Sequence, residues 1–223
     1  MCREGTNEEL RYSIRSVYAH IKNPKIWLIG GKPDWYCGNY ISVPQNKTKY
    51  ENVANNLRTL CASDQISNDF ILMNDDFFIM KDLEEIPTVY GGTLRDKILS
   101  YKKYAKHSSY TKLLINTEKE LARMGIVDAL DYAIHTPMPM NKQNLLNVIY
   151  TDLSIKIIYG NLFKVGGSKM KDVKVYDKGS LMSKSYDYTD PDAIFISSND
   201  TSFDLLYKKL FKNLFTEKTE CEK

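Results

Sequence analysis

Two adjacent carboxylates follow the most apolar short run of the chain. Residues 70–73 (FILM) are typical of a strand covered on both faces, and Asn74, Asp75 and Asp76 come directly after them. Ligands of open α/β sheets bind outside the carboxyl ends of strands, and buried paired acids need a neutralising partner. Carboxylate oxygens favour Mg²⁺ or Mn²⁺, which suggests a metal-bound diphosphate. Successive strand side chains point to opposite faces, so Asp75 and Asp76 can differ in role; the alternative is a polar strand end with one capping Asp.

A second apolar run ends in the same way. Residues 193–196 (AIFI) are expected to form a buried strand, and Asn199 and Asp200 follow it shortly before the closing helix. A carboxylate delivered from a second strand end would complete a cation site. The alternative is that Asn199 and Asp200 cap the last helix.

One of the three histidines lies in an unusual local sequence. His135 is followed by Pro137 and Pro139, which restrict the backbone, and it is expected at a boundary between a helix and a loop. An imidazole presented there could bind a metal or act as a general base. The alternative is a residue at a helix C-terminus that interacts with the helix dipole.

Two arginines of the first predicted helix are spaced to lie on one flank. Arg11 and Arg15 are four residues apart, so their guanidinium groups could hold one phosphate bidentately. The alternative is a solvated helix face close to Glu8 and Glu9.

A basic stretch follows over residues 95–112, with tyrosines between its cationic side chains. Lysine and arginine bind phosphates and tyrosine stacks on bases, so this stretch could contact a polyanion. The alternative is a solvated lysine-rich helix. The basic residues are Arg95, Lys97, Lys102, Lys103, Lys106 and Lys112, and the tyrosines are Tyr101, Tyr104 and Tyr110.

Helical and short apolar segments alternate along the chain, which favours an α/β fold with a largely parallel sheet flanked by helices. The first helix is expected to begin with a capping box of Thr6 and Glu9 and to end before Pro24. Strands are predicted over 25–29, 41–43, 70–73 and 193–196. Helices are predicted over 49–66, through much of 94–133, and in a closing row of Phe203, Tyr207, Phe211 and Phe215.

Composition limits the class of protein. The chain has 223 residues, of which 43% are hydrophobic and 26% charged, so we expect one domain over 1–223 with a helical insertion over 95–134. No apolar run reaches the roughly 18–20 residues of a membrane span, and no secretory signal is visible. Four cysteines, all far apart, suit a reducing, cytoplasmic location. The net charge of +3 is too small to indicate a nucleic-acid binder.

Taken together, these segments resemble the Stealth family of sugar-phosphate transferases, which includes capsular polysaccharide phosphotransferases. The resemblance depends on residues 7–16 (NEELRYSIRS), 25–33 and 70–78, followed by 135–137 and 195–200, in the family's order. About half of the chain is covered, and the first block is the most specific. The short length suggests a compact relative of the kind found in phages or bacterial gene clusters.

The resemblance implies a nucleotide-diphospho-sugar transferase core similar to the GT-A glycosyltransferases, with Mn²⁺ or Mg²⁺. By this likeness Asp75 and Asp76 would bind the metal and diphosphate. Asp76, His135 and Asp200 would form the catalytic site.

The same likeness assigns binding roles to several other polar side chains. Arg11, Arg15 and Arg58 would hold the phosphate or the nucleotide, and Asn74 and Asn199 would contact substrate. Members of the family normally open with a strand of the VYTWVDG kind, whereas this sequence begins at the loop after it. A start that is truncated or misassigned, or a dispensable strand, would explain the difference, and an absent strand would leave an unpaired position in the sheet.

We therefore predict a metal-dependent transferase that moves a sugar or a sugar 1-phosphate from a nucleotide-diphospho-sugar donor to a hydroxyl acceptor. One alternative is a glycosyltransferase acting on a modified base in DNA, supported by the basic stretch over 95–112. The other is a non-catalytic binding module built on a degenerate transferase core, supported by the missing first strand.

Overall fold

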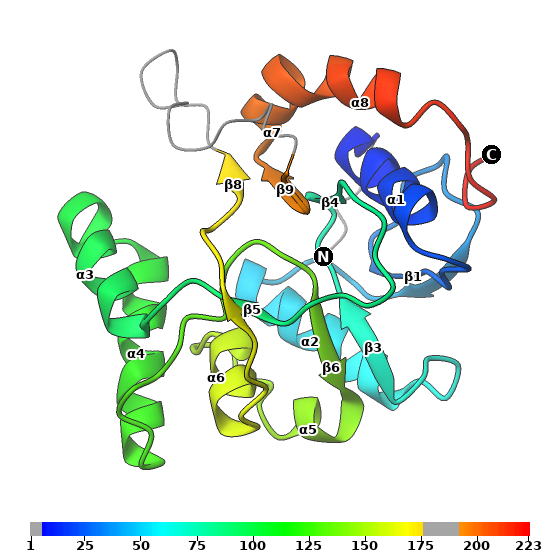
Figure 1. The fold of residues 1–223 in the computed structure, drawn as a ribbon. Helices are drawn as coiled ribbons and strands as arrows, with labels where there is room; N and C mark the ends of the chain where they lie inside the picture. Colours follow the sequence, from blue (N-terminus) through cyan, green and yellow to red (C-terminus); the bar gives the residue numbers. More distant parts are fainter. Residues whose placement is uncertain (1–5, 176–191) are drawn as a thin grey trace.

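The computed structural model describes residues 6–175 and 192–223, which form a mixed α/β structure (Figure 1). The helices described are α1 (Glu8–His20), α2 (Lys49–Ala62), α3 (Leu94–Ala105), α4 (Ser109–Arg123), α5 (Lys142–Leu146), α6 (Ile155–Leu162), α7 (Asp200–Ser202), the π-helix η2 (Phe203–Tyr207) and α8 (Lys208–Leu214). The strands described are β1 (Trp27–Gly30), β2 (Asn39–Ser42), β3 (Asp69–Leu72), β4 (Phe77–Ile79), β5 (Val89–Tyr90), β6 (Met138–Asn141), β7 (Ser168–Lys169), β8 (Lys174–Val175) and β9 (Phe195–Ser198).

The strands pair into small separate sheets. β1 pairs with β2 and β5 with β7, both in parallel, while β3 pairs with β6 in antiparallel orientation. In the third group β9 is antiparallel to β4 and parallel to β8. The prediction of one largely parallel, GT-A-like sheet is therefore wrong for the described residues, because the apolar strands β1 and β3 do not pair with each other.

The start of α1 differs from the predicted capping box. The N-cap is Asn7, whose side chain accepts a hydrogen bond from the Leu10 amide at 3.1 Å. Asn7 has a positive φ of 34°, a conformation that asparagine tolerates better than most residues. Glu9 is buried and accepts a hydrogen bond from Ser198 Oγ at 3.1 Å instead of reaching back to the helix start.

Two serines attach α1 to the edge of β4. Ser13 Oγ donates to the Phe77 carbonyl at 2.6 Å, and Ser16 Oγ accepts from the Ile79 amide at 3.0 Å. All three residues of β4 are buried. The two hydroxyls thus satisfy backbone groups that a neighbouring strand would otherwise pair.

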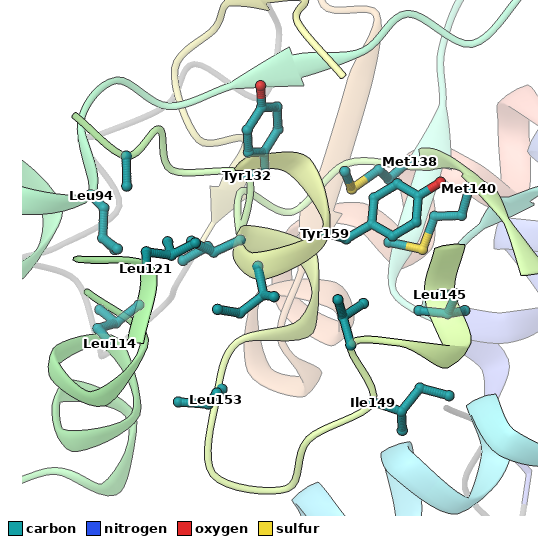
Figure 2. Close-up of a cluster of buried hydrophobic side chains, with 14 of the residues drawn as sticks. Leu94, Leu114, Leu121, Tyr132, Met138, Met140, Leu145, Ile149, Leu153 and Tyr159 are labelled. Carbon is teal, nitrogen blue, oxygen red and sulfur yellow. The ribbon is translucent and has the colours of Figure 1, made fainter. Parts of the chain in front are cut away.

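The largest buried cluster joins α3, α4, α6 and β6 (Figure 2). Tyr132 crosses α6 at Gly160, where an added Cβ would lie 2.2 Å from the ring, so only glycine permits this contact. The labelled members are Leu94, Leu114, Leu121, Tyr132, Met138, Met140, Leu145, Ile149, Leu153 and Tyr159.

The predicted aromatic row of the closing segment is buried as a group. Phe203, Tyr207, Phe211 and Phe215 pack with Phe78 of β4, the ring centroids of Phe78 and Phe211 being 4.3 Å apart. The helix that carries them is not uniform, because η2 is π-helical and α8 continues it.

The lysine-rich region is helical over only part of its predicted length. The helices α3 and α4 lie at one edge of the molecule, away from α1 and α8 (Figure 1). α4 ends at Arg123, and Gly125 then takes a φ of 82° that favours glycine. His135 lies in a bend over residues 134–136, shortly before β6, so the prediction of a helix ending there is wrong.

Candidate functional site

Asp76 lies in the turn between β3 and β4, and a lysine neutralises it. Lys174 Nζ, at the start of β8, donates to Asp76 Oδ2 and to the Ser198 carbonyl. The exposed fractions of the Lys174 and Asp76 side chains are 9% and 16%. Asp76 Oδ1 is buried and has no hydrogen-bond partner within the described ranges. The ammonium group of Lys174 thus supplies a neutralising charge for the largely buried carboxylate of Asp76.

His135 is held by a second carboxylate. Its Nδ1 lies 2.9 Å and 3.0 Å from the two oxygens of Asp172, and its backbone amide donates to Asp172 Oδ1 at 3.1 Å. Burial opposes ionisation of Asp172, but hydrogen bonds and charge from His135 outweigh it and hold the pKa of the carboxyl well below its usual range. An ionised carboxylate only accepts hydrogen bonds, so Nδ1 of His135 carries the hydrogen in this contact.

Lys156, on α6, fixes the backbone on both sides of His135. Its ammonium donates to the carbonyls of Ile134 and Thr136 at 2.8 Å and 2.9 Å, and it lies 5.7 Å from the ring centroid of Phe77. Burial lowers the pKa of Lys156 to about 8, although the nearby charges of Asp172 and Asp76, among others, partly offset this effect.

One short segment connects the two charged pairs. Asp172 and Lys174 are two residues apart at the entry to β8, and Asp172 Oδ1 also accepts a hydrogen bond from the Lys174 amide at 3.2 Å. Asp172 holds His135 while Lys174 holds Asp76. Phe77, the residue after Asp76, meets the His135 ring edge-on at a centroid distance of 6.3 Å. These five residues and Lys156 form what we name the His135 cluster.

Asn199 and Asp200 directly follow β9. The Asn199 side chain accepts from the Ser202 amide at 2.9 Å, so the structure supports the alternative that Asn199 caps the following helix, and the predicted contact with substrate stays a prediction. Asp200 is exposed in the first turn of α7. Ser198, immediately before them, donates its amide to the Asp76 carbonyl at 3.4 Å. Because β4 and β9 are paired, the two predicted strand ends are neighbours.

Asp75 and Asn74 are directed elsewhere. Asp75 Oδ2 accepts a hydrogen bond from Asn7 Nδ2 at 2.9 Å, and Asp75 and Asn74 line a cavity of about 730 Å³ that does not include Asp76 or His135. The two adjacent carboxylates therefore have different surroundings, as predicted, although both lie in the turn between β3 and β4 and not in a strand.

The predicted phosphate-binding arginines form ion pairs with a residue near the printed C-terminus. Arg15 donates from Nε and NH2 to the two oxygens of Glu222 at 2.8 Å and 2.7 Å, and Arg11 NH1 donates to Glu222 at 3.1 Å. Burial opposes ionisation of Glu222, but the hydrogen bond from Arg15 outweighs it and lowers the pKa of the carboxyl. Arg58, exposed on α2, donates to the Ile149 carbonyl at 3.2 Å.

The described residues do not make up a metal site by themselves. Within 6–175 and 192–223 no group of three or more His, Cys, Asp or Glu side chains could hold a metal ion. Asp76 offers one oxygen, Oδ1, but its other oxygen is bound by Lys174. These donors do not fit a metal ion, so dependence on Mn²⁺ or Mg²⁺ remains a prediction from the sequence.

Three residues of the His135 cluster were absent from the sequence-based prediction: Lys156, Asp172 and Lys174. Asp172 and Lys174 carry opposite charges at a spacing of two around an apolar Val173, which places them on one face of a strand. That alternation is the one sequence pattern that points to Asp172 and Lys174. Lys156 lies in an otherwise apolar helix, and no sequence pattern points to it as a site residue.

The tyrosines of the basic stretch differ in exposure. Tyr101 and Tyr110 meet edge-on at a centroid distance of 5.1 Å, between α3 and α4, and burial raises the pKa of Tyr110. Tyr104 is 83% exposed. Two of the three rings are thus in contact with each other, which leaves them poorly placed to stack on bases.

Comparison of the sequence with protein-family models gives no match, and a search of curated proteins gives none either. The resemblance to the Stealth family therefore stays a prediction. Within the part of the chain that the structure describes, no helix is both long and apolar enough to cross a bilayer.

Proposed function

We propose that the chain is a transferase that moves a sugar or a sugar 1-phosphate from a nucleotide-diphospho-sugar to a hydroxyl acceptor at the His135 cluster. The observation that carries the proposal is the contact of His135 Nδ1 with both oxygens of Asp172. A carboxylate that orients an imidazole and stabilises its protonated form is the usual arrangement of a general base.

The chemistry required of the site is removal of one proton and stabilisation of negative charge. Nε2 of His135 would take the proton of the acceptor hydroxyl, and Asp172 would stabilise the imidazolium that forms. The ammonium group of Lys156, close to the Phe77 ring, would supply positive potential toward developing phosphate charge, whereas the charge of Lys174 is already balanced by Asp76. Dependence on Mn²⁺ or Mg²⁺ belongs to the same proposal and is supported by the sequence resemblance alone.

The nucleotide released from the donor distinguishes the two forms of the reaction. The full chain is mixed with UDP-sugars and saccharide acceptors, with Mn²⁺, with Mg²⁺ and with EDTA. Release of UMP indicates transfer of a sugar 1-phosphate, and release of UDP indicates transfer of the sugar. If no donor, including CDP- and GDP-sugars, is consumed and calorimetry detects no nucleotide binding, the proposal is wrong and the non-catalytic alternative gains support.

The role of His135 is tested by His135→Gln, with His107→Gln as the matched control because His107 is exposed on the loop between α3 and α4. Loss of a general base should lower kcat by about 10²–10⁴-fold. Asp172→Asn should lower kcat and change the pH profile of the reaction while leaving KM for the donor nearly unchanged. Equal activity of His135→Gln and the wild type would contradict the assignment.

A further inference from the structure

Two of the described cysteines face each other where the segment over 219–223 pairs with the segment before β2. An isolated antiparallel bridge joins Tyr36 to Glu222, and the Cys37 amide donates to the Cys221 carbonyl at 2.8 Å. In this register Cys37 lies opposite Cys221. Opposed residues of a hydrogen-bonded antiparallel pair have Cα atoms roughly 5.5 Å apart, within the range of roughly 4.4–6.8 Å that a disulfide spans.

Each sulfur atom lies against the residue next to the other cysteine. Cys37 Sγ donates to the Glu220 carbonyl at 3.5 Å. Cys221 Sγ lies against Gly38, where an added Cβ would be 2.7 Å from the sulfur. Because Cys37 is exposed, its side chain can change rotamer freely, and this rotation is the main movement that a bond between the two sulfur atoms requires.

The surroundings of the two thiols suit a reaction in two steps. Cys37 is exposed, so a dissolved oxidant reaches it. Cys221 is only 3% exposed, and the Tyr18 hydroxyl lies 3.5 Å from its sulfur. Burial raises the pKa of the Cys221 thiol, which keeps it protonated and unreactive toward oxidants at neutral pH. Cys37 is therefore the thiol that is oxidised first.

We propose that Cys37 and Cys221 form a reversible intramolecular disulfide when the protein meets a hydroperoxide. The Cys37 sulfur attacks the hydroperoxide, whose O–O bond breaks, and the products are a sulfenic acid at Cys37 and water or an alcohol. The Cys221 sulfur then attacks the sulfenic sulfur, and the thiol proton leaves with the hydroxyl group as water. In a reducing compartment the pair consists of two thiols until such an oxidant is present.

The bond would fix the segment that neutralises the arginines of α1. Glu222 directly follows Cys221 and forms ion pairs with Arg11 and Arg15. A link between Cys37 and Cys221 closes most of the chain into one loop, and a long closed loop restricts the unfolded chain strongly. The oxidised protein should therefore be more stable than the reduced protein.

Mass spectrometry of the full chain tests the proposal. The reduced protein is treated with hydrogen peroxide, and the remaining thiols are then labelled with N-ethylmaleimide in denaturant. Digestion without reductant should give a pair of peptides joined through Cys37 and Cys221, and dithiothreitol should separate them. Sulfinic or sulfonic acid at Cys37 with Cys221 still labelled would overturn the proposal. A link from either residue to Cys2, to Cys61 or to a second chain would overturn it as well.

Two serine variants locate the reaction. Cys37→Ser removes the exposed thiol, and the matched control Cys61→Ser removes a thiol of α2 whose sulfur contacts the Lys142 carbonyl. After peroxide, Cys221 should stay labelled in Cys37→Ser, whereas Cys61→Ser should form the same link as the wild type. Peroxide should raise the melting temperature of the wild type and of Cys61→Ser, and dithiothreitol should restore it. An equal rise in Cys37→Ser would contradict the link as its cause.

Discussion

Replacement of Lys156 by methionine should alter how the stability of the protein depends on pH. The pKa of Lys156 is lowered from 10.5 to about 8 in the folded protein, chiefly by burial. Between these two values the unfolded chain binds the proton and the folded protein does not, so the free energy of unfolding rises with pH. Below about pH 8 both states are protonated, and the folded state carries the full cost of a buried charge.

The size of the effect follows from the pKa difference. About 2.5 pH units at about 1.4 kcal/mol each give about 3 kcal/mol. The free energy of unfolding of the wild type minus that of Lys156→Met should therefore increase by about 3 kcal/mol from pH 7 to pH 10.5. The loss of the hydrogen bonds to Ile134 and Thr136 adds an offset that does not vary with pH.

The assay is urea unfolding of both proteins at intervals across this range. Lys119→Met serves as the control, because Lys119 is exposed on α4 and its removal subtracts the general effect of one lysine charge. Groups that titrate equally in wild type and variant cancel in the difference. A difference between wild type and Lys156→Met that stays flat from pH 7 to pH 10.5 would refute the burial of a charged ammonium beside His135.

Further predictions concern the attachment of α1 and the helix caps. Ser16→Val leaves the buried Ile79 amide without an acceptor and should reduce the free energy of unfolding by about 1–3 kcal/mol in urea titrations, whereas Ser100→Val, at an exposed position, should change it little. Glu222→Gln should destabilise the protein by about 2 kcal/mol at neutral pH. Because the pKa of Glu222 is lowered on folding, this difference should begin to shrink below the ordinary value of 4.5 and vanish once the pH lies below the lowered pKa of the folded protein; a difference that persists in strong acid would show that charge is not its cause. Thr48→Ala removes the capping box of α2 and should lower the melting temperature by an amount equivalent to about 1 kcal/mol.

Local signals predicted the elements better than their assembly. Apolar runs gave β1, β3 and β9 to within two residues, because a short buried strand needs a continuous apolar sequence. The helix predicted over 49–66 begins where α2 does, at Lys49, and ends four residues later than α2. At the first helix the pattern around Thr6 misled, because the buried carboxylate of Glu9 is used by Ser198 from a distant strand.

The candidate site shows the same division between local and distant information. Two strand ends were predicted to meet, and pairing of β4 with β9 brings Asp76 next to Ser198. Lys174 opens the two-residue strand β8 and Asp172 lies two residues before it, so the alternation around Val173 is too short to indicate a strand by itself. Sequence reasoning placed Arg11 and Arg15 on one helix flank, but their partner Glu222 lies 207 residues after Arg15, beyond any local rule.

The contact between α1 and Glu222 also bears on synthesis. Ribosomes release a chain from its amino end, so α1 emerges long before the strand β4, 64 residues further on at the Ser13 contact, and longer still before Glu222. A nascent chain of half length therefore contains β4 but lacks the Glu222 carboxylate, with which both Arg11 and Arg15 form ion pairs. Contacts of such high sequence separation slow folding, so α1 is expected to reach its final packing only after residue 222 has left the ribosome.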